Sequence, residues 1–167
     1  MSFLVPVRYP ATNGFDIAME STPASVRTAR RVAYAWSRHC RVPADLVDAL
    51  LLIVSELCTN AILYGSSDTI GARVWMPYVC ELRIEVADYT PSPPPSVQHP
   101  EGDAESGRGL FLVNALVAAV GGSWGFTRDG TRVWCTLPLP SSKPHISVSA
   151  RVPQGSRQDP VSPYAHP

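Results

Sequence analysis

The chain carries little charge and no excess of either sign. Only 17% of its 167 residues are charged, and 14 lysines and arginines balance 14 aspartates and glutamates. A protein that holds nucleic acid or an anionic membrane by electrostatics needs a basic surface, so a net charge of zero argues against both kinds of partner. We therefore expect no direct contact with nucleic acid and none with a membrane.

Cysteine is scarce and lacks the spacing of a metal site. The 4 cysteines stand far apart at positions 40, 58, 80 and 135, without a C-x-x-C pair. Each has apolar neighbours in the sequence, where a free thiol behaves as a small hydrophobic side chain. The pattern predicts neither a zinc site nor a disulfide framework.

Long hydrophobic runs are also missing. No apolar stretch reaches the ~20 residues that a membrane span needs, and residues 1–8 have neither the basic start nor the apolar middle of a signal peptide. The sequence therefore predicts a cytoplasmic protein.

What the chain does have is enough apolar material for one core. A hydrophobic fraction of 45% suits a single compact domain, which we place at 13–140 after an N-terminal extension at 1–12. Residues 141–167 are rich in proline and serine and contain few apolar side chains. They could not offset an ordering cost of about 1–2 kcal/mol per residue, so we expect a disordered tail.

Apolar periodicity predicts three helices and five strands. Thr22 before Pro23 is typical of a helix start, Gly65 of a helix end, and Asp129-Gly130 of a hairpin turn. This pattern favours an α/β (α+β) two-layer sandwich, with a mostly antiparallel sheet covered on one face by the helices. The expected helices are 23–40, 44–64 and 109–120, and the expected strands are 13–20, 72–79, 81–87, 123–128 and 131–137.

The helix expected at 44–64 carries the most informative residues. At about 100° per residue, its apolar positions 46, 50, 53, 57 and 61 form one stripe, and Glu56 and Asn60 lie together beside it, one turn apart. Polar pairs at this spacing often belong to a solvated face. These two residues alone leave a functional role and a structural one equally open.

Three further features follow along the chain. Asp88 ends the strand expected at 81–87, and a proline-rich stretch of the kind that is functional or disordered comes after it. Gly107-Arg108-Gly109 precedes an apolar helix whose start offers unpaired N–H groups to phosphate. Gly130-Thr131 leads the last strand.

These four elements in this order resemble the GHKL superfamily, the ATP-binding domains named for gyrase, the heat-shock chaperone, histidine kinases and the mismatch-repair ATPase. The likeness covers about residues 14–138. It is closest to the anti-sigma factor serine/threonine kinase branch of actinobacterial type, through Ser-Glu-Leu-Cys-Thr-Asn-Ala, Glu-Ser-Gly-Arg-Gly-Leu and Val-Trp-Cys-Thr-Leu-Pro. The resemblance implies a Bergerat-type ATP-binding fold, whose sheet is mixed and mostly antiparallel.

The resemblance also implies a role for each site residue, with ATP and Mg²⁺ as ligands. Glu56 resembles the catalytic base and Asn60 the magnesium ligand, which suits a hard cation that prefers oxygen. Asp88 resembles the aspartate that accepts a hydrogen bond from the adenine amino group. Phosphate contacts are implied for Gly107 and Gly109 and an additional one for Arg108, and Thr131 corresponds to a threonine of the nucleotide pocket.

Two positions depart from the family pattern. Many relatives continue the adenine aspartate as Asp-x-Gly-x-Gly, whereas here Asp88-Tyr-Thr-Pro-Ser-Pro-Pro contains neither glycine. Proline stiffens a loop that would have to bend in order to close over a nucleotide. Tyr64 stands where this branch often has histidine.

The sequence leaves competing functions open. One is a kinase that phosphorylates an anti-sigma factor antagonist and otherwise sequesters a sigma factor; the sequence leaves its oligomeric state open, with a homodimer as one alternative. A second is a nucleotide-gated protein-binding module with little or no turnover. A sensor histidine kinase ranks last, because Cys40-Arg41 follows His39 where such a kinase needs an acidic residue. The four arginines at positions 27, 30, 31 and 38 are typical of a solvated helix face, or of a partner surface.

Overall fold

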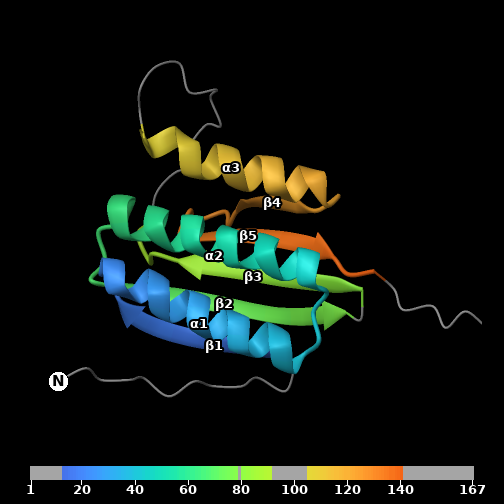
Figure 1. Ribbon diagram of the computed structural model, residues 1–167. Helices are drawn as coiled ribbons and strands as arrows, with labels where there is room; N and C mark the ends of the chain where they lie inside the picture. The colour runs from blue at the N-terminus through green and yellow to red at the C-terminus, as the bar shows by residue number, and fades with distance from the viewer. Residues whose placement is uncertain (1–12, 79, 92–104, 141–167) are drawn as a thin grey trace, which may run out of the picture.

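A computed structural model describes residues 13–78, 80–91 and 105–140 (Figure 1). The extension and tail expected at 1–12 and 141–167, and residues 92–104 of the proline-rich stretch, lie outside this part of the chain. The elements in chain order are β1 (Gly14–Glu20), α1 (Pro23–His39), α2 (Ala44–Tyr64), β2 (Thr69–Tyr78), β3 (Glu81–Ala87), α3 (Glu105–Ala119), β4 (Ser123–Phe126) and β5 (Arg132–Pro138).

The five strands form one sheet in the order β1-β2-β3-β5-β4. Its four pairings are all antiparallel within the described residues, whereas the resemblance implies a mixed sheet. All three helices lie on the same face of the sheet (Figure 1). The two-layer sandwich predicted from the sequence is confirmed.

Strict alternation along β3 shows why the sheet has two different faces. Successive side chains of a strand point to opposite sides, and Leu82, Ile84 and Val86 are buried beneath the helices. The residues between them are polar and partly exposed on the other side. Burial of the apolar side chains therefore defines the register, since a slip by one residue would bring charges into the core.

Helix α2 occupies the centre of the helical layer, between α1 and α3. Its predicted stripe is confirmed, because Leu46, Leu50, Ile53, Leu57 and Ala61 are all buried. Contrary to the sequence-based expectation, Ala44–Tyr64 is long and apolar enough to cross a membrane, with a mean hydropathy of 1.9. Here those apolar side chains form the core of the domain.

Several predicted boundaries are wrong, and pairing partners explain two of them. Strand β2 begins at Thr69 and not at 72, because Thr69 pairs with Glu20 at the end of β1. Strand β4 ends at Phe126 and not at 128, because the hairpin turn already begins at Thr127, whose carbonyl accepts a bond from the Gly130 N–H. Helix α3 begins at Glu105, four residues before the predicted 109.

Both helix caps differ from their predicted form. Thr22 precedes Pro23 at the start of α1 as expected, but its side chain makes no capping hydrogen bond. Gly65 ends α2 with a φ of −71°, outside the left-handed region that favours glycine. Its small size is needed instead, because a Cβ there would lie 2.9 Å from the Cβ of Asp88. The end of α2 and the end of β3 therefore approach closely at this position.

Three cysteines lie in apolar surroundings as predicted, and one does not. Cys58 and Cys135 are buried, Cys40 packs partly buried against the core, and Cys80 is exposed in the turn after β2. No two of them are joined by a disulfide. The prediction of free thiols is therefore confirmed, and the apolar environment predicted for Cys80 is wrong.

Candidate functional site

The edge of α2 brings Glu56 and Asn60 to the boundary with α3. Both side chains are partly exposed beside the buried stripe, as the helical spacing predicts. The Asn60 Nδ2 group is buried and has no hydrogen-bond partner within the described residues. A buried amide without a partner is costly unless something else satisfies it. This amide is therefore a candidate ligand contact.

Gly109 in α3 faces this pair directly. A Cβ built on Gly109 would lie 2.9 Å from Glu56 Oε2 and 3.1 Å from Asn60 Oδ1. No side chain fits between the two helices at this position without displacing a polar group of α2. The missing side chain therefore lets the carboxylate of Glu56 and the carboxamide of Asn60 approach the backbone of α3 closely.

The glycine motif has a different setting from the predicted one. Because α3 begins at Glu105, Gly107 and Gly109 lie in its first turns and not before it. The first N–H groups of a helix have no intrahelical partner and attract anions. Because Gly109 in these first turns lies close to Glu56 and Asn60, the N-terminal end of α3 adjoins both residues. The side chain of Arg108 lies outside what the structure describes, and its phosphate contact stays a prediction.

Asp88 follows β3 directly and is held by its own neighbours. Its N–H donates to the Thr131 carbonyl over 3.2 Å, which ties it to the start of β5. One carboxylate oxygen, Oδ1, accepts the Thr90 N–H at 2.9 Å, and Thr90 Oγ1 in turn accepts the Ser66 N–H at 2.9 Å. Within the described residues Oδ2 has no such partner, so it remains free to accept a hydrogen bond from a ligand.

These hydrogen bonds stabilise the turn after Asp88, where the resemblance implies glycines that this chain lacks. The turn that positions Asp88 is an Asx turn closed by the Thr90 N–H, a conformation that aspartate stabilises with its own side chain. Thr90 then bonds to the loop after α2 through Ser66. Side-chain hydrogen bonds thus hold the segment in which the resemblance implies two glycines.

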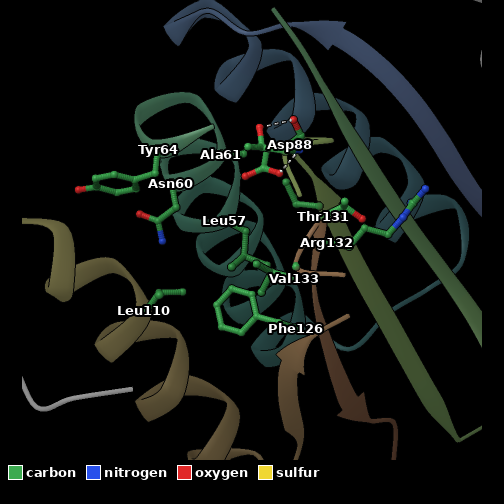
Figure 2. A pocket seen from close by; sticks show the side chains of 13 residues that line it. Leu57, Asn60, Ala61, Tyr64, Asp88, Leu110, Phe126, Thr131, Arg132 and Val133 are labelled. Atoms are coloured by element: carbon green, nitrogen blue, oxygen red, sulfur yellow. Dashed lines mark hydrogen bonds between the residues drawn. The ribbon is translucent and has the colours of Figure 1, made fainter. Parts of the chain in front are cut away.

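Thr131 lies beside Asp88 at the end of the β4–β5 hairpin (Figure 2). Its N–H and its hydroxyl both donate to Asp129 Oδ1, at 3.2 and 2.9 Å. Hydrogen bonds from Thr127 and Thr131 lower the pKa of the exposed Asp129 carboxyl. Gly130 between them has a φ of 71°, as the turn prediction requires. The hairpin turn therefore fixes the position of Thr131.

Asn60, Asp88 and Thr131 line a single pocket of about 460 Å³, which is within the range of sites for small molecules and cofactors. Figure 2 shows Asp88 and Thr131 at one end of it in this view, with Leu110 and Phe126 at the other. The complete lining is Leu57, Asn60, Ala61, Tyr64, Val86, Asp88, Thr90, Leu110, Phe126, Gly130, Thr131, Arg132 and Val133.

The apolar wall of this pocket was not among the residues selected from the sequence. Leu57 is nearly one turn before Asn60 on α2, Leu110 follows Gly109 on α3, and Phe126 pairs with Val133 across the hairpin. In the sequence each is an ordinary apolar residue, and it lines the pocket only because α2, α3 and the β4–β5 hairpin come together around it. A flat, largely apolar base would suit this wall.

A cation would find oxygen donors here but no protein cage. The described residues contain no group of three or more histidine, cysteine, aspartate or glutamate side chains able to hold a metal. Asn60 Oδ1, with Glu56 Oε2 close by on the same helix edge, fits a hard ion that takes its remaining oxygens from water and phosphate. The donor set therefore suits Mg²⁺ carried in with a nucleotide.

Two other residues considered from the sequence stand as follows. Tyr64 lines the pocket from the last turn of α2 and is 55% exposed. His39 ends α1 and is not among the residues that line this pocket. The geometry thus brings together Glu56, Asn60 and Gly109, and places Asp88 and Thr131 in the adjoining pocket.

A structural likeness accompanies this geometry. The histidine kinase domain of the Erythrobacter litoralis blue-light activated histidine kinase is similar, with 22% sequence identity, a TM-score of 0.43, and coverage of 79% of this chain and 70% of that one. Among curated proteins, no sequence matches the chain.

A family model provides the firmer comparison. The model of the histidine kinase-like ATPase domain matches residues 19–137, which is more than half of the chain. The match extends from the end of β1 almost to the end of β5, so it includes every residue of the site described above. The chain belongs to the histidine kinase-like ATPase domain family.

Proposed function

We propose that this protein binds Mg-ATP in the pocket between α2, α3 and the β4–β5 hairpin. The observation that carries the proposal is the convergence of Glu56, Asn60 and Gly109 beside the pocket of Asp88. The adenine amino group would donate to Asp88 Oδ2, and the phosphates would reach the first turns of α3. Bound Mg²⁺ would draw charge from the phosphate oxygens and so favour attack at phosphorus.

We further propose that the protein is a serine/threonine kinase. Glu56 takes the proton of a substrate hydroxyl, the hydroxyl oxygen bonds to the γ-phosphorus, and the bond from that phosphorus to the bridging oxygen of ADP breaks. The partly exposed position of Glu56 beside Asn60 supports this role, because an incoming hydroxyl could reach it. The products are a phosphorylated protein and ADP.

The proposed substrate is an anti-sigma factor antagonist, and the proposed second partner is a sigma factor that the protein sequesters in the cytoplasm. A surface on α1 supports protein partners. Arg27, Arg30 and Arg31 border a hollow beside Tyr34, which is 50% exposed. Among the described residues the only ion pairs involve Arg83 and Arg132 with Glu85, so these three guanidinium groups are free to meet acidic side chains.

Nucleotide binding is tested by thermal unfolding with and without millimolar Mg-ATP. A ligand at 100 times its dissociation constant should stabilise the fold by roughly 2.7 kcal/mol and raise Tm by about 5–11 °C in a chain of this size. Asn60→Ala and Asp88→Ala should each remove most of this shift. Asp48→Asn, an exposed position on the same helix, should keep it. Absence of a shift in the wild type would contradict the proposal.

The kinase is distinguished from a nucleotide-gated binding module by Glu56→Gln. This variant keeps the shape of the side chain and should keep the thermal shift, while transfer of labelled γ-phosphate to a co-purified antagonist falls by about 10²–10⁴-fold. Asp48→Asn should transfer at the wild-type rate. If neither wild type nor variant transfers phosphate although ATP and partner bind, the binding module is the better description.

The partner surface has a separate test. Arg27→Ala, Arg30→Ala and Arg31→Ala together should weaken capture of the sigma factor without changing the Mg-ATP shift, because α1 does not line the nucleotide pocket. Undiminished capture by this triple variant would locate the partner surface elsewhere.

A further inference from the structure

Tyr89 stands between Asp88 and Thr90, which both line the pocket, and its backbone is unusual. Its φ is 56°, in the left-handed region that a bulky side chain seldom adopts. Asp88 before it faces the pocket, and Thr90 after it closes the Asx turn on Asp88 Oδ1. The turn of the chain at Tyr89 is therefore what brings the Thr90 N–H back to the carboxylate.

The side chain of Tyr89 lies on the opposite face of the sheet from the helices. Its Oη would be 2.5 Å from a Cβ on Gly71, and its Cζ 3.3 Å from the same point. Gly71 pairs with Ala18 on one side and Ala87 on the other, so three small residues leave a shallow strip on the outer face. The Arg132 guanidinium lies over the Tyr89 ring, 6.0 Å from its centre.

A left-handed conformation at tyrosine persists only where its surroundings hold it. Here the Tyr89 ring packs over the backbone at position 71, which is possible because Gly71 has no side chain. Tyr89 as a whole is still 45% exposed. Gly71 is a strand residue with no positive φ, so close approach of Tyr89, and not backbone freedom, accounts for glycine at this position.

We propose that Tyr89 is a positioning residue for nucleotide recognition, held over Gly71 so that Asp88 presents Oδ2 to the base. The ring never touches the nucleotide. It acts through the backbone, by fixing the turn in which Asp88 Oδ1 is occupied by Thr90 and Oδ2 is left for the ligand. This inference rests on the proposed binding of ATP, because the position of Asp88 affects affinity only through its hydrogen bond to the base.

The position of Asp88 determines base selectivity as well as affinity. Adenine offers an amino donor where guanine has a carbonyl acceptor, so a well-placed carboxylate favours ATP and repels GTP. If the carboxylate moves, part of this discrimination is lost. Selectivity for a hydrogen-bonding group on the base requires that the accepting oxygen is held at hydrogen-bonding distance from it. A merely structural role for Tyr89 would change stability and leave the ratio of ATP to GTP affinity unchanged.

The experiment measures the Kd of Mg-ATP and Mg-GTP for the full chain and four variants. Tyr89→Ala removes the ring, and Gly71→Ala pushes it away, since the added Cβ clashes with the far end of the Tyr89 side chain and makes only ordinary van der Waals contact with the Ala87 Cβ. Each should weaken ATP binding about tenfold, the size of a lost hydrogen bond to a charged group, and lower the ATP preference. Tyr89→Phe keeps the ring and should stay within about twofold of wild type.

The double variant Gly71→Ala/Tyr89→Ala provides the decisive comparison. Because both changes break one contact, the double variant should bind ATP no more weakly than Tyr89→Ala alone. Additive losses would overturn the inference, as would wild-type affinity and selectivity in Tyr89→Ala. If Tyr89→Ala does not fold, Gly71→Ala and Tyr89→Phe decide the matter by the same criteria. Failure of the wild type to bind ATP would overturn the proposed function as well, whereas wild-type binding with unchanged variants would overturn this inference alone.

Discussion

At the scale of single residues, most glycines around this site are required because there is no room for a Cβ, and fewer because their φ is positive. Gly65, Gly71 and Gly109 lie where a neighbouring side chain occupies the volume of a Cβ, and none of them has a positive φ. Gly121 and Gly130 are the opposite case, with φ of 74° and 71°. The two kinds of glycine therefore respond differently to alanine.

Gly109→Ala should separate stability from ligand binding. Alanine is favoured over glycine inside a helix by roughly 0.5–1 kcal/mol, so the unliganded variant should unfold at the wild-type temperature or slightly above it. The new Cβ would displace Glu56 and Asn60, so the Tm increase with Mg-ATP should be largely lost. Both quantities come from one set of thermal melts.

Gly121→Ala is the matched control for this prediction. Its Cβ would meet no atom within 4 Å, but its φ of 74° strains an alanine. This variant should lose stability and keep the Mg-ATP shift. A full ligand shift in Gly109→Ala would show that ligand binding does not depend on the close approach of Glu56 and Asn60 to α3.

At the scale of elements, α3 is the helix whose placement decides whether the site exists. It packs on α2, β4 and β5, with Val113 and Val117 buried beneath it. Asn114 Oδ1 also accepts a hydrogen bond from Trp124 Nε1 on β4 at 3.0 Å. The buried valines, with Leu110 and Leu116 partly buried against the core, therefore hold the element that carries Gly109.

Val113→Ala should test this dependence. Two buried methyl groups are lost at a fully buried site, which at about 0.8 kcal/mol per group plus a cavity term predicts a loss of about 2 kcal/mol in the free energy of unfolding. Because α3 loosens, Mg-ATP should also bind more weakly. Denaturant unfolding and ligand titration would measure the two effects.

Phe111→Ala, on the exposed side of the same helix at 60% exposure, serves as its control. This variant should stay within about 0.5 kcal/mol of wild-type stability, as surface substitutions usually do. Equal losses of unfolding free energy in Val113→Ala and Phe111→Ala would mean that the buried valines do not hold α3 in place.

At the scale of the whole molecule, two buried thiols make stability depend on pH in the alkaline range. Burial raises the pKa of Cys58 and of Cys135 from the ordinary value of 9.0 to about 12. Above pH 9 the unfolded chain releases these protons while the folded chain retains them. The stabilisation is complete below pH 9 and is lost as pH rises towards 12.

Denaturant unfolding at pH 8 and pH 10 should show this linkage. At pH 10 each buried thiol should lower the free energy of unfolding by roughly 1 kcal/mol. Cys58→Ala should reduce the pH dependence, and Cys80→Ser should not, because Cys80 is exposed. A thiol reagent should accordingly label Cys80 in the native protein and Cys58 only after unfolding. Rapid labelling of native Cys58 would contradict the prediction.

Much of the architecture could be predicted from the sequence because it depends on local pattern. The stripe of α2, the alternation of β3 and the Asp129-Gly130 turn each follow from one short stretch of residues, and all are confirmed. Element ends were less predictable. Thr69 belongs to β2 only because Glu20 lies opposite it, and the sequence of β2 alone does not contain that information.

The features of the site likewise divide into those that the sequence predicts and those that depend on the tertiary structure. The sequence by itself determined which polar groups are available, because the positions of Glu56 and Asn60 on one helix edge and of Asp88 at a strand end follow from helical and strand periodicity. Only the tertiary structure decided what faces them: Gly109 opposite Glu56, Phe126 as a pocket wall, and Tyr89 seated on Gly71. Those contacts join residues far apart in the chain, and they depend on how closely packed elements approach, a distance that no local pattern encodes.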